Sequence, residues 1–250
     1  MGAPTRWTSG FTQAAKWQPL GNLGIPDPFF YATYEDDFLP YNAAEYTVTA
    51  AGGTVAATAA NGSGGRILFT TAGTAPSFAE IQLPVAGLQY TAGKKLSYLA
   101  RIQVANITTS ALVVGLIGTN ATPFTSIADG IYFSKVAGST NLVLTAVTGS
   151  VVVGTATINV ATSGLANATD IDLGIYVSPT GSIFAFVGSN LEGAKRQDFA
   201  TLGPTASILG TALTGALTAV LLNPTIAVSN GATAAPMTAV ADFQFAAQER

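Results

Sequence analysis

Apolar and polar residues alternate with a period of two along most of the chain, which is typical of half-buried β-strands. In residues 170–177 one predicted face is aliphatic and the other is polar or small: Ile171, Leu173, Ile175 and Val177 against Asp170, Asp172, Gly174 and Tyr176. The turn signal Ser178-Pro179-Thr180-Gly181 follows, and a second apolar run ends at Val187. We therefore predict a β-hairpin over residues 170–187.

Short apolar runs separated by turn residues recur at about ten-residue spacing from residue 46 to the end of the chain. The predicted strands include 46–50, 54–59, 66–70, 78–83, 95–104, 111–117, 129–134, 142–148, 151–160, 217–222 and 239–247. Such regular short strands are typical of a β-sandwich and not of βαβ units. We predict one all-β domain over residues 36–250, an antiparallel β-sandwich of the jelly-roll type.

Residues 1–35 lack this alternation and contain both tryptophans of the chain. Pro26-Asp27-Pro28 favours extended backbone before each proline. We predict an extended N-terminal arm, which either lies on its own domain or docks on another subunit, where aromatic side chains supply much of the binding energy. The residues predicted to contact a partner are Trp7, Phe11, Trp17, Phe29, Phe30 and Tyr31.

The composition narrows the chemistry available to this protein. The sequence has no His and no Cys, which excludes His-based acid–base catalysis, Ser-His-Asp triads and thiolate chemistry. Charged residues make up 9% of the chain, against about 25% in an ordinary soluble domain. The net charge of −3 and the scattered basic residues argue against binding nucleic acid. A surface made of Thr, Ser, Asn, Gly and Ala adheres to neighbours more readily than a charged one, so we expect a homo-oligomer.

Two acidic motifs and one apolar segment are candidate functional features of the sequence. Asp170 and Asp172 would lie on one face of a strand about 7 Å apart, within the range that glycoside hydrolysis uses. We interpret them instead as solvent-side residues, because no aromatic platform accompanies them. Glu35-Asp36-Asp37 lacks the spacing of a calcium loop, so we expect no metal and no cofactor. The uncharged segment 207–222 is interpreted as buried loop and strand and not as a membrane helix.

The order of several short segments resembles the concanavalin A-like jelly rolls of tailed-bacteriophage structural proteins. These segments are Asp129-Gly-Ile-Tyr-Phe133, Asp172-Leu-Gly-Ile-Tyr-Val177, Phe184-Ala-Phe186, the run from Leu222 to Gly231, and Val240-Ala-Asp-Phe-Gln-Phe245. The resemblance covers residues 36–250 and is one of pattern, without a diagnostic motif. In such proteins the sandwich serves as a decoration, cement or fibre module on the particle. The acidic and Asn cluster that forms the metal site of the lectin members is not recognisable here.

The resemblance implies a non-enzymatic virion protein. We predict a decoration or cement subunit on the capsid surface, which binds other virion proteins, above all the major capsid protein, and stabilises the particle. By analogy the homo-oligomer would be a trimer, with no nucleic acid and no membrane as partners. The alternative is a carbohydrate- or receptor-binding module of a phage fibre.

Overall fold

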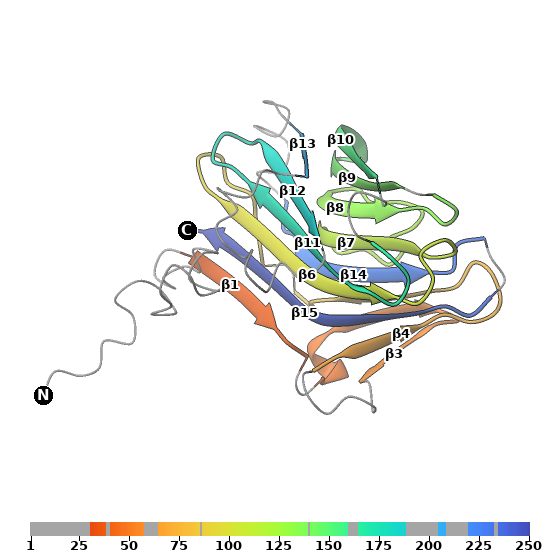
Figure 1. The fold of residues 1–250 in the computed structure, drawn as a ribbon. Coiled ribbons are helices and arrows are strands. Elements are labelled where there is room, and N and C mark those ends of the chain that lie inside the picture. The colour runs from red at the N-terminus through yellow and green to blue at the C-terminus, as the bar shows by residue number, and fades with distance from the viewer. Residues whose placement is uncertain are drawn as a thin grey trace, which may run out of the picture.

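The computed structural model describes residues 31–38, 41–57, 65–85, 87–139, 141–159, 165–188, 205–208, 220–232 and 235–250. These residues form two antiparallel β-sheets packed face to face (Figure 1). One sheet has eight strands in the order β13 (Ala206–Ile208), β12 (Ile183–Gly188), β11 (Asp170–Val177), β6 (Leu96–Val104), β15 (Thr238–Glu249), β4 (Ile67–Thr70) and β3 (Thr54–Ala57), with β1 (Tyr31–Asp36) also paired to β15. The predicted all-β sandwich is confirmed.

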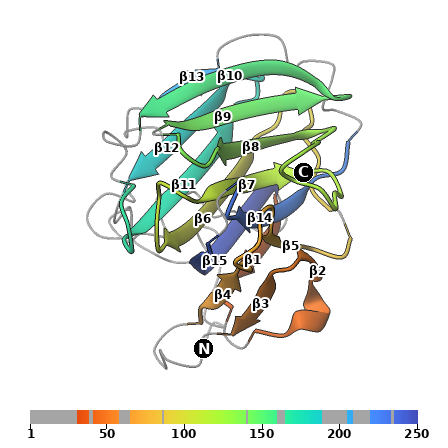
Figure 2. The same cartoon turned by 90° about the vertical axis from the view of Figure 1, so that its right-hand side faces the viewer.

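The second sheet has seven strands. Their order is β10 (Val151–Asn159), β9 (Asn141–Thr148), β8 (Gly130–Lys135), β7 (Ala111–Ile117), β14 (Asn223–Ser229), β5 (Phe78–Gln82) and β2 (Thr47–Ala51). A short 3-10 helix, η1 (Ala43–Glu45), precedes β2. Figure 2 shows the two sheets as stacked layers, with β10 and β13 side by side at one edge. In the described part of the chain, no helix is long and apolar enough to cross a membrane.

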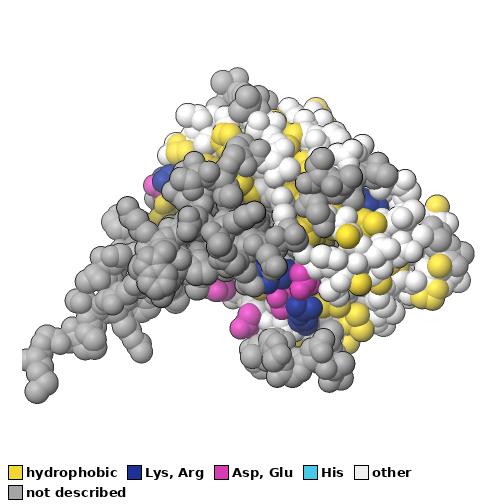
Figure 3. Space-filling model, in the orientation of Figure 1, with side chains coloured by type: hydrophobic (Ala, Val, Ile, Leu, Met, Phe, Trp, Pro, Cys, Tyr) yellow, Lys and Arg dark blue, Asp and Glu magenta, His cyan; other side chains and the backbone are white. Residues whose placement is uncertain are grey.

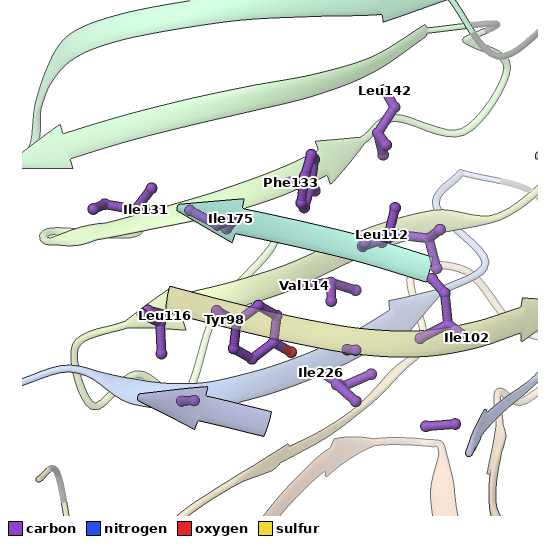
Figure 4. Packing of buried hydrophobic residues seen from close by; sticks show 14 of the residues in the cluster. Tyr98, Ile102, Leu112, Val114, Leu116, Ile131, Phe133, Leu142, Ile175 and Ile226 are labelled. Carbon is purple, nitrogen blue, oxygen red and sulfur yellow. The ribbon is translucent and has the colours of Figure 1, made fainter. Parts of the chain in front are cut away.

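Aliphatic and aromatic side chains from the inner faces of both sheets fill the space between them (Figure 4). Tyr98, Ile102 and Ile175 of the eight-stranded sheet point toward Leu112, Phe133 and Ile226 of the other sheet, among others. Each strand gives every second residue to this layer, because successive side chains point to opposite sides of a strand. The predicted inner face of β11 is confirmed, since Ile171, Leu173, Ile175 and Val177 are all fully buried.

The predicted hairpin is also confirmed. β11 and β12 pair with the register Val177↔Ile183 and Tyr176↔Phe184. Gly181 closes the turn with a φ of 82°, a left-handed conformation that glycine adopts without steric cost. Its N–H donates to the carbonyl oxygen of Ser178 at 2.9 Å. Gly181 therefore acts at this turn as the sequence indicated.

The boundary between the arm and the sandwich requires a correction. Residues 31–35 were assigned to the arm, but Tyr31–Asp36 forms β1, which pairs antiparallel with β15 from Tyr31↔Glu249 to Asp36↔Gln244. The sandwich thus begins no later than Tyr31. The alternation in this strand is hard to see in the sequence because Tyr, Thr, Glu and Asp occupy a strand that is only partly buried.

A β-bulge in β15 changes which side chains face the core. The sequence predicted that Ala239, Ala241, Phe243, Phe245 and Ala247 share one face, yet the pairing with β6 shifts by one residue between Ala241 and Phe243. Before the bulge the alanines lie in the main core; after it Phe245 and Ala247 pack with Leu99 on the outer face. An extra residue in one strand reverses the side on which all following residues lie.

The central strand β14 was mislocated. The sequence predicted a strand at residues 217–222, of which 217–219 lie outside the described residues, and it predicted none at Asn223–Ser229, the strand that lies between β7 and β5. Pro224 lies opposite Leu116. A proline lacks the N–H that a central strand needs, so its presence argued against the correct assignment. Residues 209–219 lie outside the described part of the chain.

Candidate functional site

Charged side chains gather on the outer face of the eight-stranded sheet. The group consists of Arg66, Arg101, Asp170, Asp172 and Asp242, which we call the carboxylate–arginine cluster. Arg66 Nη2 lies 3.0 Å from Asp170 Oδ2, and Arg66 Nε lies 3.2 Å from Asp242 Oδ1. Arg101 Nη1 lies 3.6 Å from Asp242 Oδ2. Figure 3 shows how sparse charge is elsewhere on this face, where most visible side chains are uncharged.

The pair Arg101–Asp172 is the most buried part of the cluster. The two residues lie opposite each other in the β6–β11 register. Arg101 donates from Nε to Asp172 Oδ1 at 2.7 Å and from Nη2 to Oδ2 at 3.1 Å, a bidentate arrangement. Asp172 has no exposed surface and Arg101 is 5% exposed. This geometry fixes both carboxylate oxygens of Asp172.

The bulge in β15 completes the environment of Arg101. Asp242 and Phe243 both fall beside Arg101, because the extra residue makes two positions of β15 oppose one of β6. The Phe243 ring centre lies 5.4 Å from Arg101 Cζ, within range of a cation–π contact. The bulge thus brings an anion and an aromatic ring to the same guanidinium.

The interpretation of Asp172 as a solvent-side residue was wrong. The carboxylate is fully buried because Arg101, directly across the sheet, satisfies its charge and its hydrogen bonds. Asp170 is partly exposed and paired with Arg66, so the two carboxylates do share a face as predicted. Glycoside hydrolysis requires a free acid and a free base or nucleophile. Here each carboxylate is held by an arginine.

Glu80 is a buried carboxyl that sequence analysis did not single out. It lies in β5, opposite Thr49 of β2 and Ala227 of β14, and has no exposed surface. Neither carboxyl oxygen has a hydrogen-bond partner among the described residues. Burial raises the pKa of Glu80 to about 8, so the group is neutral at pH 7.

Gln82, two residues further along β5, differs from Glu80 because both ends of its side-chain amide are hydrogen-bonded. Its amide donates to Thr225 Oγ1 at 2.9 Å, and its side-chain oxygen accepts from the Asn120 N–H at 3.0 Å. The signal that could have identified Glu80 is a lone acid between apolar neighbours in the strand Phe78-Ala-Glu-Ile-Gln82. The sequence does not reveal that this strand is covered on both sides.

A groove of about 650 Å³ lies on the outer face of the seven-stranded sheet, and we call it the sheet groove. Its floor includes Val113 and Tyr132, and one wall is the loop that carries Phe124 and Ile127. The opposite wall is formed by residues 136–138 and by Gly231 and Ala232. The lining is mainly apolar with scattered hydroxyl groups, which is the usual character of a binding pocket.

Lys135 is the one charged residue among those that line the sheet groove in the described chain. Its ammonium donates to the carbonyl oxygens of Ser110 at 2.9 Å and Val136 at 3.2 Å, and the residue is 2% exposed. Burial lowers the pKa of its amino group. The charge that lines the groove is therefore almost fully buried and bonded to backbone carbonyl groups.

Of the residues predicted to contact a partner, the structure places Tyr31. It is the first described residue of β1, is half-buried and pairs with Glu249. Burial, and to a lesser extent the charge of Glu249, raises the pKa of its hydroxyl. Trp7, Phe11, Trp17, Phe29 and Phe30 lie outside the described residues, so their role stays a prediction.

The acidic run before the sandwich has a local structural role. Asp36 Oδ1 accepts the N–H of Phe38 at 2.6 Å, which stabilises the turn after β1. Phe38 is buried and has a φ of 57°, so this turn holds the chain in an unusual conformation. Asp36 therefore shapes the entry to the sandwich.

No protein-family model and no curated protein sequence matches the chain. Solved structures are similar in fold. Arcelin-5, a lectin-like defence protein from Phaseolus vulgaris, is 8% identical, with 88% of this chain and 100% of that one covered and a TM-score of 0.57. The endo-1,3-beta-glucanase from Streptomyces sioyaensis is 13% identical, with 90% and 98% covered and a TM-score of 0.55. The carbohydrate recognition domain of Emp47p is 9% identical, with 90% and 99% covered and a TM-score of 0.54.

These likenesses define the class of fold. The sandwich is a concanavalin A-like jelly roll, as the sequence pattern predicted. The fold houses enzymes and binding proteins alike, so it does not determine the function.

Proposed function

We propose that this chain is a non-catalytic binding subunit that works by assembly, of the decoration or cement type on a virus particle. The observation that carries the proposal is that the candidate catalytic carboxylates are paired with arginines. The carboxylate pair that could have performed hydrolysis is held by Arg66 and Arg101. The chain as a whole is poor in charge, with 13 acidic and 10 basic residues in 250.

Exposed apolar residues support a protein-binding surface. Val48, Val85, Val136, Val151, Val152 and Leu221 are each more than a third exposed. Two of them begin β10, an edge strand that carries no charged residue and is largely exposed. Charged side chains usually protect such edges from pairing with other chains. An uncharged edge suits a subunit that is covered in its working assembly.

We expect the purified protein to form a defined homo-oligomer at moderate salt, because an uncharged exterior lacks the repulsion that keeps copies apart. Light scattering coupled to size exclusion measures the mass directly. Co-sedimentation with tailed-phage capsids that lack this protein then tests the particle role. A stable monomer that does not sediment with capsids would refute the proposal.

A carbohydrate-binding module is the second candidate. Its support is the sheet groove, whose hydroxyl and aromatic lining suits a sugar, together with the fold that arcelin-5 and the Emp47p domain share with this chain. A glycan array separates the two candidates. Reproducible binding of one glycan class, lost in a Phe124→Ala variant, would favour the carbohydrate function over assembly.

A further inference from the structure

We propose that the sheet groove of one copy receives the aromatic N-terminal segment, residues 1–30, of a second copy, so that copies associate head to tail. The inference rests on the proposed assembly function and names the surface that would carry it. Four observations support it: the character of the groove, the chemistry of the segment, the place where the segment joins the sandwich, and the position of the groove.

The groove suits an apolar and uncharged occupant. Its lining combines the rings of Phe124 and Tyr132 with small aliphatic side chains such as Ala111 and Val113. Lys135, the charged residue of the lining, directs its ammonium into backbone carbonyl groups. Its volume falls in the range of about 300–1,000 Å³ that is usual for pockets. A basic partner would find no opposite charge in this lining, and an acidic or phosphorylated one would find only the ammonium of Lys135, which is bonded to backbone carbonyl groups and almost fully buried.

The N-terminal segment has matching chemistry. Residues 1–30 contain five aromatic residues, Trp7, Phe11, Trp17, Phe29 and Phe30, and three charged ones, Arg6, Lys16 and Asp27. Tryptophan and other large aromatic side chains are the usual anchors of protein interfaces, because they bury much apolar area with little loss of conformational entropy. Of the segments outside the described residues, this one contains both tryptophans of the chain.

The start of β1, to which the segment is joined, and the groove are at opposite ends of the sandwich. Tyr31 pairs with Glu249, beside the start of β6, since Gln248 pairs with Leu96. Figure 1 shows the start of β1 and the C-terminus together at the left end. The groove includes Thr108 and Thr109, which follow the far end of β6 at Val104. The nine residues of β6 separate these ends by about 26 Å.

The two surfaces also belong to different layers. The segment leaves from the eight-stranded sheet, and the groove lies on the outer face of the seven-stranded sheet. A donor at one end and an acceptor at the other give a heterologous contact, which closes into a ring when the rotation between copies permits. A closed ring of three copies is consistent with the trimer expected from the family resemblance.

The chain provides its own probe for a test. Trp7 and Trp17 are its two tryptophans, so intrinsic tryptophan fluorescence of the full-length protein reports on the N-terminal segment alone. We expect the emission to move to shorter wavelength as protein concentration rises, in parallel with the mass from light scattering, because the indoles enter an apolar groove of another copy.

Two matched variants assign the acceptor. Val136 borders the groove and is 71% exposed, whereas Val85 is 76% exposed and is not part of the groove lining. Val136→Asp places a charge where an apolar partner would sit, and should raise the concentration at half-association by about tenfold or more. Val85→Asp should leave it unchanged, and neither exposed position should impair folding.

Several results would overturn the proposal. A monomeric protein whose emission maximum lies at short wavelength and shifts in Val136→Asp would mean that the segment occupies the groove of its own chain. Emission typical of exposed indole at every concentration means that the groove is not its site. An oligomer whose mass and emission are the same in Val136→Asp as in wild type would refute the groove as the acceptor, while leaving the assembly function intact. A monomer at all concentrations would refute both.

Discussion

Glu80→Gln should remove most of a decline in stability with rising pH that the wild-type protein shows. The pKa of Glu80 in the folded protein is about 8, against an ordinary value of 4.5. The folded state therefore holds a proton that the unfolded state has lost between these values, and the unfolding free energy falls as pH rises from about 4.5 to about 8. The shift corresponds to about 5 kcal/mol.

The difference in unfolding free energy between wild type and Glu80→Gln should change over the same pH range. At pH 4 the two proteins should have similar stability, because both the protonated carboxyl and the amide are neutral. At pH 9 Glu80→Gln should be more stable by several kcal/mol, since it avoids a buried, unpaired charge. Urea unfolding at a series of pH values measures this, and urea adds no ionic screening.

Glu35→Gln is the matched control for this experiment. Glu35 is exposed in β1, so its removal should leave the slope of stability against pH unchanged. A wild-type protein whose stability is flat between pH 5 and pH 8, or a Glu80→Gln variant whose stability declines as steeply as that of wild type, would contradict the assignment of a neutral buried carboxyl to Glu80.

Arg101→Met should destabilise the fold by about 3–5 kcal/mol, the usual cost of removing one partner from a buried ion pair. The substitution keeps much of the side-chain volume and leaves Asp172 without the two hydrogen bonds that its oxygens accept from Arg101. It also removes the contact with the Phe243 ring. The midpoint of urea unfolding at pH 7 provides the measurement.

Two further variants separate burial from simple loss of charge. Arg66→Met removes an arginine whose side chain is 24% exposed, and should cost at most about 1 kcal/mol. The double variant Arg101→Met/Asp172→Leu removes both buried charges and should recover much of the loss seen in Arg101→Met. Equal destabilisation by Arg66→Met and Arg101→Met would show that the buried Arg101–Asp172 pair contributes no more to stability than the partly exposed arginine does.

The cluster also bears on why the chain is proposed to bind and not to catalyse. A carboxylate that must act as acid or nucleophile needs at least one oxygen directed at a substrate. In Asp172 both oxygens are directed at Arg101, within a side chain that has no exposed surface. The pair therefore ties β6 to β11 across the outer face of the sheet.

The candidate sites were less accessible to sequence reasoning than the fold. The pair Asp170 and Asp172 was found because strand alternation places residues i and i+2 on one face. Its arginine partners lie about 70 and 100 positions away in the chain and are brought near by sheet pairing. Glu80 and the sheet groove were missed, because both depend on which segments, far apart in the chain, lie side by side in the folded protein.

The sequence by itself determined the fold class, the hairpin of β11 and β12, and the inner face of β11. These follow from the alternation of apolar residues and from turn residues such as Pro179 and Gly181, which act over a few neighbouring positions. Only the tertiary structure decided that Asp172 is buried, that β15 changes face at its bulge, and that Pro224 lies in a central strand. Each of these depends on which strand lies alongside, and that pairing joins residues far apart in the chain.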